Sequence, residues 1–524
     1  MKFAKIIILG CMAFGFLYGI TWGAPEDGLV APNGGLSKTK IDRLESFIKR
    51  QMRLGKIPGM AVAVVQDDRV VYRRGFGFAN TGRKQPVTPE TMFELGSTSK
   101  AFTALGILYL AEKGLLDTHD PVKKYIPWFQ MTKRKKMVDP TLESLNRWFP
   151  CFYVTQNTDI TIEQLLHHTS GIDPVTIADI PPSRSPDSLE KTVRTVMRKA
   201  MKPQMDYYPG ERYQYTTINY DILGLIISKV SGQPYEDFMK EHILEPFGMN
   251  HTVLFREQAG KNLATGYKVG FLRPLEYNAP MYRGNTPAGY VISSVEDMSW
   301  WLKIQMGTAP VSPFYRQIVD QSHHDDYDYS NGWIIHRMSD GIKFSHAGAN
   351  PNYSSYIEFW LPEKLGIILL LNCNSGFAGG IGEGIVNIIH GRGRIPERLF
   401  DMYVDYDGIS CLVMVALLII IGLSIRFVVE RYHSYPKYTG VGGKNSVKFL
   451  IFILLLIVLS TTSYFLPKII FGYYWAFLAV WGPITVLIAL ALVFIEIMIG
   501  YLYLWNVCFF KNKDKKAGSK VQNH

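Results

Sequence analysis

Cysteine is scarce in this chain, which contains five cysteines in 524 residues. Three of them lie in long apolar stretches, so only Cys151 and Cys373 remain for a water-soluble region. No cysteine spacing matches a zinc site or a redox pair. The sequence therefore predicts neither a bound metal nor a thiol redox centre. Cys151 and Cys373 could form one disulfide or remain two separate thiols, and we favour separate thiols.

Basic charge is also scarce over most of the chain, although the formal net charge is +11. Residues from Ile409 onward contain 11 Lys and Arg against 3 Asp and Glu, a net charge of +8, which leaves +3 for residues 1–408. A nucleic-acid-binding protein carries its basic residues on a folded surface. Here they flank apolar segments instead, so the composition does not support nucleic acid as a partner.

The first apolar stretch lies within residues 1–24. Lys2 and Lys5 are followed by an apolar run from Ile6 to Trp22, and then by Gly23-Ala24. This order is typical of an export signal, which is either cleaved after the small residues or kept as an N-terminal anchor. Both outcomes predict that the residues after it lie outside the cytoplasm.

Three further apolar runs lie at Ile409–Val429, Phe449–Phe465 and Trp475–Tyr501. A membrane-spanning helix needs about 20 apolar residues, and the second run, at roughly 17, is the shortest. Lysines and arginines concentrate in the loop after the first run and in the tail at 511–524. By the positive-inside rule, that loop and the tail are cytoplasmic. We therefore predict a three-helix transmembrane domain at 409–510 in the cell (inner) membrane, with the preceding region on the periplasmic or extracellular side.

Two residues in the third apolar run are unusual for a membrane helix. Pro483 is expected to kink this helix, because proline removes a backbone hydrogen bond. Glu496 is a carboxylate at membrane depth, where acidic residues are costly and often functional. We favour the simpler interpretation that Glu496 pairs with a basic neighbour or reaches the membrane surface.

Residues 36–394 show the patterns of a folded domain. Strand-like stretches occur at both ends of this region, at Met60–Val65 and Arg69–Tyr72 and again in four segments between Gly332 and Leu371. The residues between them are mainly helical in pattern, and Ala101–Lys113 is the strongest helix. This order predicts an α+β domain with an antiparallel sheet flanked by helices and an additional all-helical region.

Two local features refine that prediction. Ser37 is placed to cap an amphipathic helix whose apolar positions begin at Ile41. Met131–Pro150 is a basic stretch that contains a tryptophan and interrupts the helical pattern. It could form a lid or a membrane-facing flap, and we favour an ordinary surface insertion.

A serine and a lysine stand three residues apart in Gly96-Ser97-Thr98-Ser99-Lys100, just before the helix predicted from Ala101. Residues i and i+3 share a helix face, so the Lys100 amine is expected beside the Ser97 hydroxyl. A serine hydroxyl is a weak nucleophile near neutral pH, and a lysine can act as its base only when its pKa is lowered. Unpaired N–H groups at a helix start suit an oxyanion. These features predict nucleophilic catalysis at Ser97.

Such a site needs two more elements. One is a hydroxyl that can relay protons, and Tyr215 in Tyr-Thr-Thr, between Pro209-Gly210 and a predicted helix, supplies it. The other is an edge strand that completes an oxyanion hole, and His346-Ala347-Gly348 at the end of a predicted strand supplies it.

These motifs, together with Leu165–Gly171 and in this order, resemble those of the serine β-lactamase and penicillin-binding-protein superfamily, on the side of class C β-lactamases and DD-peptidases. The resemblance covers about residues 36–394 and implies a β-lactamase-like fold. It implies Ser97 as nucleophile, Lys100 as general base and Tyr215 as relay and general acid. It also implies the N–H groups of Ser97 and Ala349 as the oxyanion hole.

The motifs depart from the superfamily pattern at two positions. Thr217 stands where many members have asparagine after the relay tyrosine. His346, which would line the substrate site, stands where β-lactamases usually have lysine. The second departure argues against hydrolysis of β-lactams.

A closer resemblance is to the prodrug-activating peptidases of nonribosomal peptide pathways, which include the colibactin-maturing peptidase. They join an exported hydrolase to three C-terminal membrane helices and remove an N-acyl-D-asparagine cap from an inactive precursor. The runs Glu94–Thr103, Asn219–Gly224, Asn278–Tyr290 and Ser345–Ser355 look like theirs. The resemblance implies that D-asparagine is held by Glu94, Thr217, Asn285 and Asn350. Thr217 replaces a serine and Asn285 a histidine of the colibactin enzyme, and both keep hydrogen-bonding ability.

We therefore predict a membrane-bound serine peptidase that cleaves an N-acyl-D-asparagine motif during export, in antibiotic maturation and self-resistance. Its partners would be the acyl-D-asparaginyl peptide, membrane lipid and an exporter, and it would need no cofactor. One alternative is a DD-peptidase or esterase of the penicillin-binding-protein type that acts on cell-wall peptide or small esters. The alternative from another class is a non-catalytic membrane binding protein.

Overall fold

The fold is described from a computed structural model, which covers residues 35–137, 152–200, 207–324, 326–391, 399, 401–440 and 446–511. The export segment at 1–24, Cys151 and the tail beyond 511 lie outside these residues. The chain divides into two compact units, which are described separately. One contains the residues from Met402 onward and the turn Val269–Arg273, and the other contains the remaining described residues up to Asp401.

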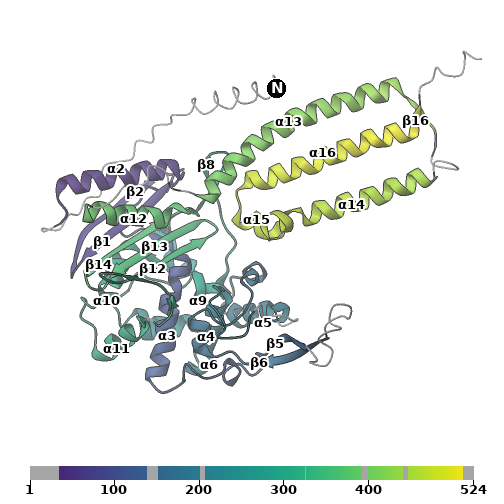
Figure 1. The fold of residues 1–524 in the computed structure, drawn as a ribbon. Coiled ribbons are helices and arrows are strands. Elements are labelled where there is room, and N and C mark those ends of the chain that lie inside the picture. Colours follow the sequence, from purple (N-terminus) through teal and green to yellow (C-terminus); the bar gives the residue numbers. More distant parts are fainter. Residues whose placement is uncertain are drawn as a thin grey trace, which may run out of the picture. The chain divides into compact units, whose positions relative to one another are not determined.

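The larger unit is built on an antiparallel sheet of eight strands in the order β10-β11-β12-β13-β14-β1-β2-β3 (Figure 1). β1 pairs with β14, so the first and last strands of the unit meet at the middle of the sheet. Both are buried over almost their whole length, as their apolar sequences require. The strands are β1 (Gly59–Gln66), β2 (Arg69–Asn80), β3 (Gln85–Pro86), β10 (Tyr329–Ser330), β11 (Trp333–Met338), β12 (Gly341–Asn350), β13 (Tyr353–Trp360) and β14 (Leu365–Leu371).

Helices cover both faces of this sheet. On one face, α2 (Lys38–Leu54) and α12 (Phe377–His390) pack together and bury Phe47 and Ile385 against the strands (Figure 1). On the other face lie α3 (Lys100–Glu112), α10 (Val295–Gln305) and α11 (Pro313–Ser322), where Phe102 stacks on Trp301 with ring centroids 4.0 Å apart. The predicted α+β architecture is confirmed. Ser37 occupies the N-cap position of α2, but its side chain makes no capping hydrogen bond, so that part of the prediction is wrong.

A helical region adjoins α3. Its main element is α6 (Ile218–Ser231), which packs on α3, α4 and α5 because its apolar residues surround almost the whole helix. It is followed by α7 (Tyr235–Met239) and a π-helical turn, Lys240–Leu244. The other elements are α4 (Ile162–Leu166), α5 (Ser188–Ala200), α8 (Arg256–Ala259) and the 3₁₀ turns Val122–Lys124, Pro174–Asp179 and Gly260–Asn262.

The interruption predicted at Met131–Pro150 begins as a strand. β5 (Met131–Met137) pairs antiparallel with β6 (Phe152–Thr158), and the residues that join them lie outside the described part of the chain. Two other small sheets lie in the described residues before Met402. β4 (Met92–Glu94) pairs with β9 (Ile292–Ser294), and β7 (Tyr267–Gly270) pairs with β8 (Arg273–Glu276).

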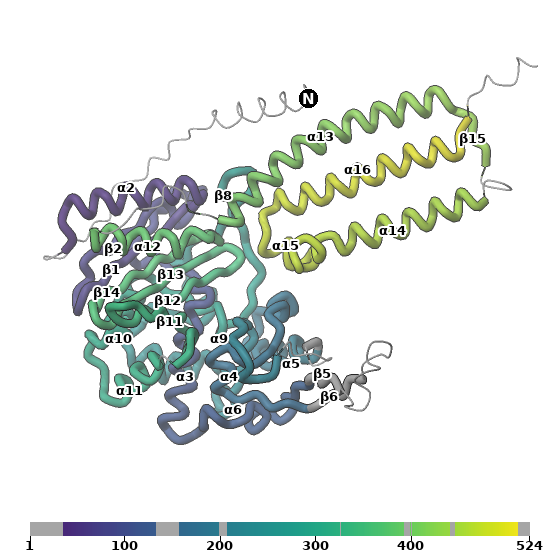
Figure 2. Tube along the Cα trace, viewed as in Figure 1, coloured from purple at the N-terminus to yellow at the C-terminus, as the bar shows by residue number. Residues whose placement is uncertain are grey.

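The described part of the smaller unit contains three helices that are long and apolar enough to span a membrane, α13 (Met402–Ser434), α14 (Ser446–Phe471) and α16 (Ile484–Phe509) (Figure 2). α13 and α16 pack along each other, and the short pair β15 (Lys437–Tyr438) and β16 (Phe510–Lys511) joins their ends. The predicted third run is not one kinked helix. It divides into α15 (Trp475–Trp481) and α16, because Pro483 forces Gly482 into an extended conformation with ψ 162°.

Glu496 lies on α16 and contacts α13. The Ser424 hydroxyl donates a hydrogen bond to its Oε1 at 2.6 Å, whereas Oε2 is buried and has no partner among the described residues. The expectation of a basic neighbour is therefore wrong. Glu496 binds the adjacent helix through a serine, and this bond ties α13 to α16.

Candidate active site

Ser97 lies in a single 3₁₀ turn, Gly96–Ser99, between β4 and α3. Gly96 has a positive φ of +57°, which favours glycine, and a Cβ atom there would overlap the backbone nitrogen of Ala349. The chain can therefore pass close to β12 only with glycine at this position. The residues on both sides of Ser97 are buried, while Ser97 itself is partly exposed, as a nucleophile must be.

Lys100 is fully buried and faces Ser97. Its Nζ donates to Ser97 Oγ at 3.0 Å and to the backbone oxygen of Ala288 at 2.7 Å. Burial lowers the pKa of Lys100 to about 7, although the nearby Asp221 carboxylate acts in the opposite direction. A large fraction of the amine is therefore neutral near physiological pH and can accept the proton of Ser97.

Tyr215 lies beside the Lys100 amine. Its ring centroid is 5.1 Å from Lys100 Nζ, and the ring of His168 packs on it at 4.3 Å. Burial raises the pKa of the Tyr215 phenol, while the Ser97 hydroxyl lowers it by a smaller amount. The phenol is therefore protonated at neutral pH. Its buried oxygen has no partner of regular hydrogen-bond geometry among the described residues, so it can donate to a substrate.

The last part of β12 forms the opposite wall of the site. β12 pairs with β11 only up to Ser345, so residues 346–350 pair with β13 on one side and border the Ser97 turn on the other. The close approach of Gly96 to Ala349 makes the backbone of Ser97 and that of Ala349 neighbours. Two N–H groups beside one serine are the arrangement that stabilises a tetrahedral oxyanion.

His346, at the start of this segment, is buried and uncharged. Its Nδ1 donates to the backbone oxygen of Ala347 at 2.7 Å, and its Nε2 lies 3.1 Å from the Tyr329 hydroxyl. Burial, together with the positive charge of Lys100, lowers the pKa of His346 to about 3. The side chain therefore shapes the wall but cannot supply the positive charge that a lysine would offer to a substrate carboxylate.

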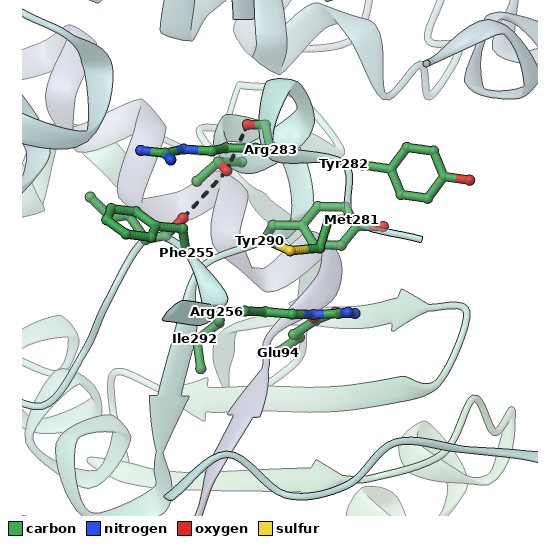
Figure 3. A pocket seen from close by; sticks show the side chains of 10 residues that line it. Glu94, Phe255, Arg256, Met281, Tyr282, Arg283, Tyr290 and Ile292 are labelled. Carbon is green, nitrogen blue, oxygen red and sulfur yellow. Dashed lines mark hydrogen bonds and ion pairs between the residues drawn. The ribbon is translucent and has the colours of Figure 1, made fainter. Parts of the chain in front are cut away.

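Glu94 and Asn350 are in direct contact at the end of β4. Asn350 Nδ2 donates to Glu94 Oε2 at 2.7 Å and to the backbone oxygen of Gly289 at 2.9 Å. Arg256 forms an ion pair with the other oxygen of Glu94. Figure 3 shows these two side chains next to each other in the wall of a pocket. Glu94 is fully buried, so its carboxylate fixes Asn350 and Arg256 in place. The oxygen of the Asn350 amide is left as an acceptor.

Asn285 reaches the same place from the turn Arg283–Asn285, which precedes α9 (Thr286–Gly289). Its amide satisfies its neighbours when Nδ2 faces Asp221 and donates to the two carboxylate oxygens at 2.8 and 3.0 Å. Gly289 lies between the two asparagines. Asn350 Oδ1 is 3.6 Å from the position of a Gly289 Cβ, and the outward atom of the Asn285 amide is 3.8 Å from it.

The predicted substrate residues are thus only partly brought together. Asn285 and Asn350 flank Gly289, which is also close to Gly96, and Glu94 contacts Asn350. Thr217 instead occupies the N-cap position of α6, and no hydrogen bond in the described part of the chain joins its side chain to this group. The structure adds residues that the motifs did not identify, namely Asp221, Ala288 and Gly289. Of these, Asp221 had a detectable signal, because it is an acidic residue within a mainly apolar helix.

Among the described residues, no group of three or more His, Cys, Asp or Glu side chains could hold a metal ion. Cys373 is buried and forms no disulfide with another residue in the described ranges.

Comparisons with known proteins agree with this geometry. The Beta-lactamase family profile matches residues 44–384. Protein flp of Staphylococcus aureus (strain MW2) is 28% identical over 473 residues, which are 87% of this chain and 88% of that protein. A match of that length extends past the hydrolase unit into the C-terminal helices. Penicillin-binding protein 4* of Bacillus subtilis (strain 168) is 25% identical over 403 residues, 70% of this chain and 80% of its own.

A solved structure shares the fold as well. The octameric penicillin-binding protein homologue from Pyrococcus abyssi superposes with a TM-score of 0.55 at 28% identity, covering 71% of this chain and 81% of that one. The family profile spans well over half of the sequence and includes Ser97, Lys100, Tyr215 and the end of β12. The chain therefore belongs to the Beta-lactamase family and is a serine hydrolase of the β-lactamase and penicillin-binding-protein type.

Proposed function

We propose that this protein is a membrane-tethered serine peptidase that removes an N-acyl-D-asparagine cap from a peptide precursor. The observation that carries the proposal is the position of Gly289. It lies beside the turn that holds Ser97, and it is flanked by two side-chain amides that the protein itself keeps oriented.

The reaction follows from the positions of three side chains. Ser97 Oγ attacks the amide carbonyl carbon that follows the D-residue, and its proton passes to Lys100 across the 3.0 Å contact. The carbonyl oxygen becomes an oxyanion beside the N–H groups of Ser97 and Ala349. The Tyr215 phenol donates a proton to the leaving amine, and Lys100 restores the proton to Tyr215. Water then attacks the acyl-enzyme by the same route in reverse and releases the N-acyl-D-amino acid.

The polar groups around Gly289 suit a carboxamide side chain. With Nδ2 of Asn285 turned to Asp221, the Asn285 oxygen faces this space, as does Oδ1 of Asn350. Two acceptor oxygens suit the NH₂ of an asparagine, which has two donors. A side-chain carboxylate, which only accepts, would face two acceptors and be repelled.

The proposed location follows from the charge pattern and the apolar helices. Lysines and arginines flank the helices of the smaller unit on one predicted side, so the hydrolase unit is assigned to the periplasmic or extracellular side. A peptidase there meets its substrate only after export. We therefore propose membrane lipid as its environment and an exporter in the same membrane as its partner.

The test uses the full-length protein in detergent with an N-acyl-D-asparaginyl amide and its L isomer, with products separated by mass spectrometry. Cleavage of the D form alone, abolished by Ser97→Ala, is expected. Equal cleavage of both isomers, or none of the D form, would sink the proposal. Absence of fluorophosphonate labelling at Ser97 would instead support a non-catalytic protein.

Gly289→Ala tests the pocket separately from the chemistry. The nearest atoms to the added Cβ are 3.6 Å away, an ordinary contact, so the fold should tolerate the methyl group. The methyl group would occupy the place of the substrate carboxamide. We expect loss of D-asparaginyl cleavage with fluorophosphonate labelling retained. Unchanged cleavage would show that the substrate carboxamide does not bind at Gly289.

A DD-peptidase is the second candidate, because a relative is named penicillin-binding protein 4*. Its substrate would end in a carboxylate, which the uncharged His346 would not attract. Turnover of a D-Ala-D-Ala peptide without cleavage of the D-asparaginyl amide would favour this candidate.

A further inference from the structure

Asp221 is a buried carboxylate that the reaction described above does not use. It lies in the first turn of α6 and is fully shielded from solvent. An unpaired charge at such a place is costly, so a buried carboxylate is kept only where donors and an opposite charge surround it.

Asp221 has these partners, and all of them belong to the site. Both of its oxygens accept from Asn285 Nδ2, at 2.8 and 3.0 Å. The backbone N–H of Ala288 also donates to it, while the backbone oxygen of Ala288 accepts from Lys100 at 2.7 Å. Ala288 of α9 thus connects the carboxylate to the catalytic amine, and Asn285, just before α9, connects it to the substrate pocket.

Asp221 is the charged group that acts on the pKa of Lys100. Burial raises the pKa of Asp221 well above its ordinary value, although Lys100 and the Ala288 N–H act in the opposite direction. Burial lowers the pKa of Lys100, and the charge of Asp221 acts against burial by favouring the protonated amine. The other titratable groups near Lys100 are two aromatic hydroxyls and two uncharged imidazoles, namely Tyr215, Tyr220, His168 and His346. Tyr235 and Tyr290 adjoin Asp221 itself.

We propose that Asp221 is a positioning residue that places a negative charge behind Lys100 and holds Asn285 with its oxygen toward the substrate. The first effect sets the pH range in which Lys100 acts as a base. The second makes the pocket select a carboxamide over a carboxylate, and it rests on the proposed function.

The first effect is tested with a small p-nitrophenyl ester, which has no side chain to select. In the full-length Asp221→Asn variant, the acid limb of the kcat/KM profile should move to lower pH by about one unit, because the neighbouring negative charge is lost. Glu358→Gln is the matched control. Glu358 is a buried carboxylate on β13 that pairs with Lys343 of β12, and its loss should leave the acid limb in place.

An unchanged acid limb in Asp221→Asn would overturn the first effect. Asp221→Glu, which restores the charge, should return the limb to the wild-type position. Where Asp221→Asn does not fold, Asp221→Ser provides an uncharged side chain of smaller volume, and the same shift is expected.

The second effect is tested with N-acyl-D-asparaginyl and N-acyl-D-aspartyl amides. Asparagine at position 221 offers one acceptor oxygen, so Asn285 is free to turn its NH₂ toward the substrate. The ratio of kcat/KM values, high for D-asparagine in the wild type, should fall about tenfold. An unchanged ratio would overturn this effect. If the wild type cleaves neither amide, the proposed function fails, while the ester profile still decides the first effect.

Discussion

Lys100 makes a prediction about stability as well as activity. Burial lowers its pKa from 10.5 to about 7. Each pKa unit corresponds to about 1.4 kcal/mol. When Lys100 is charged in the folded protein, the free energy of unfolding is therefore lower by about 5 kcal/mol. Replacing it with methionine, an unbranched apolar side chain that can follow the same path, removes this cost.

The sign follows from proton binding. Between pH 7 and 10.5 the unfolded chain holds the Lys100 proton and the folded chain does not, so stability rises with pH across this window. The cost is complete below pH 7 and absent above pH 10.5. Lys100→Met should therefore be more stable than the wild type at pH 6, and the difference should shrink toward pH 10.

Thermal unfolding of the full-length protein in detergent measures this difference. A change of 1 kcal/mol corresponds to about 2 °C for a unit of this size, so several degrees are expected at pH 6. Asp221 loses its opposite charge in Lys100→Met, which reduces the gain, and the Lys100→Met/Asp221→Asn variant removes that loss. Fluorophosphonate labelling should disappear in both variants. If the difference in melting temperature does not change with pH, the conclusion that burial lowers the pKa of Lys100 is refuted.

Three further predictions concern the reaction and the turn. Because the neutral amine of Lys100 is the base, kcat/KM for a small ester should be about tenfold lower at pH 6 than on its alkaline plateau, and a flat profile would exclude Lys100 as base. Tyr215→Phe should slow amide cleavage by about 10² or more but spare a p-nitrophenyl ester, whose leaving group needs no proton, and the exposed Tyr213→Phe is its control. Gly96→Ala should abolish labelling through overlap with Ala349, whereas Gly114→Ala, at a similar φ of +69° but with no atom within 4 Å, should cost only backbone strain and keep labelling.

Much of the fold was predictable because its signals are local. β1 and β14 are continuous apolar runs, and such runs predict buried strands wherever they pair. The three membrane-type helices follow from run length in the same way. The contact of Ser97 with Lys100 was also predictable, since three residues of helix place the two side chains on one face.

The remaining features depend on residues that are distant in sequence. Glu94 is 162 positions from Arg256 and 256 from Asn350, so no local pattern could indicate that its carboxylate holds both. Asn285 and Asp221 meet only because α9 packs on α6. Similarly, Glu496 could be identified as unusual, but its serine partner belongs to another helix.

The sequence by itself determined which side chains could react and where the chain would enter a membrane, because spacing along a helix and the length of an apolar run are properties of neighbouring residues. Only the tertiary structure decided the electrostatic state of those side chains. The low pKa of Lys100 requires complete burial under α6 and α9, and the orientation of Asn285 requires a carboxylate 64 residues away. Desolvation and long-range hydrogen bonds exist only once the chain has packed, and they turn a serine and a lysine into a nucleophile and its base.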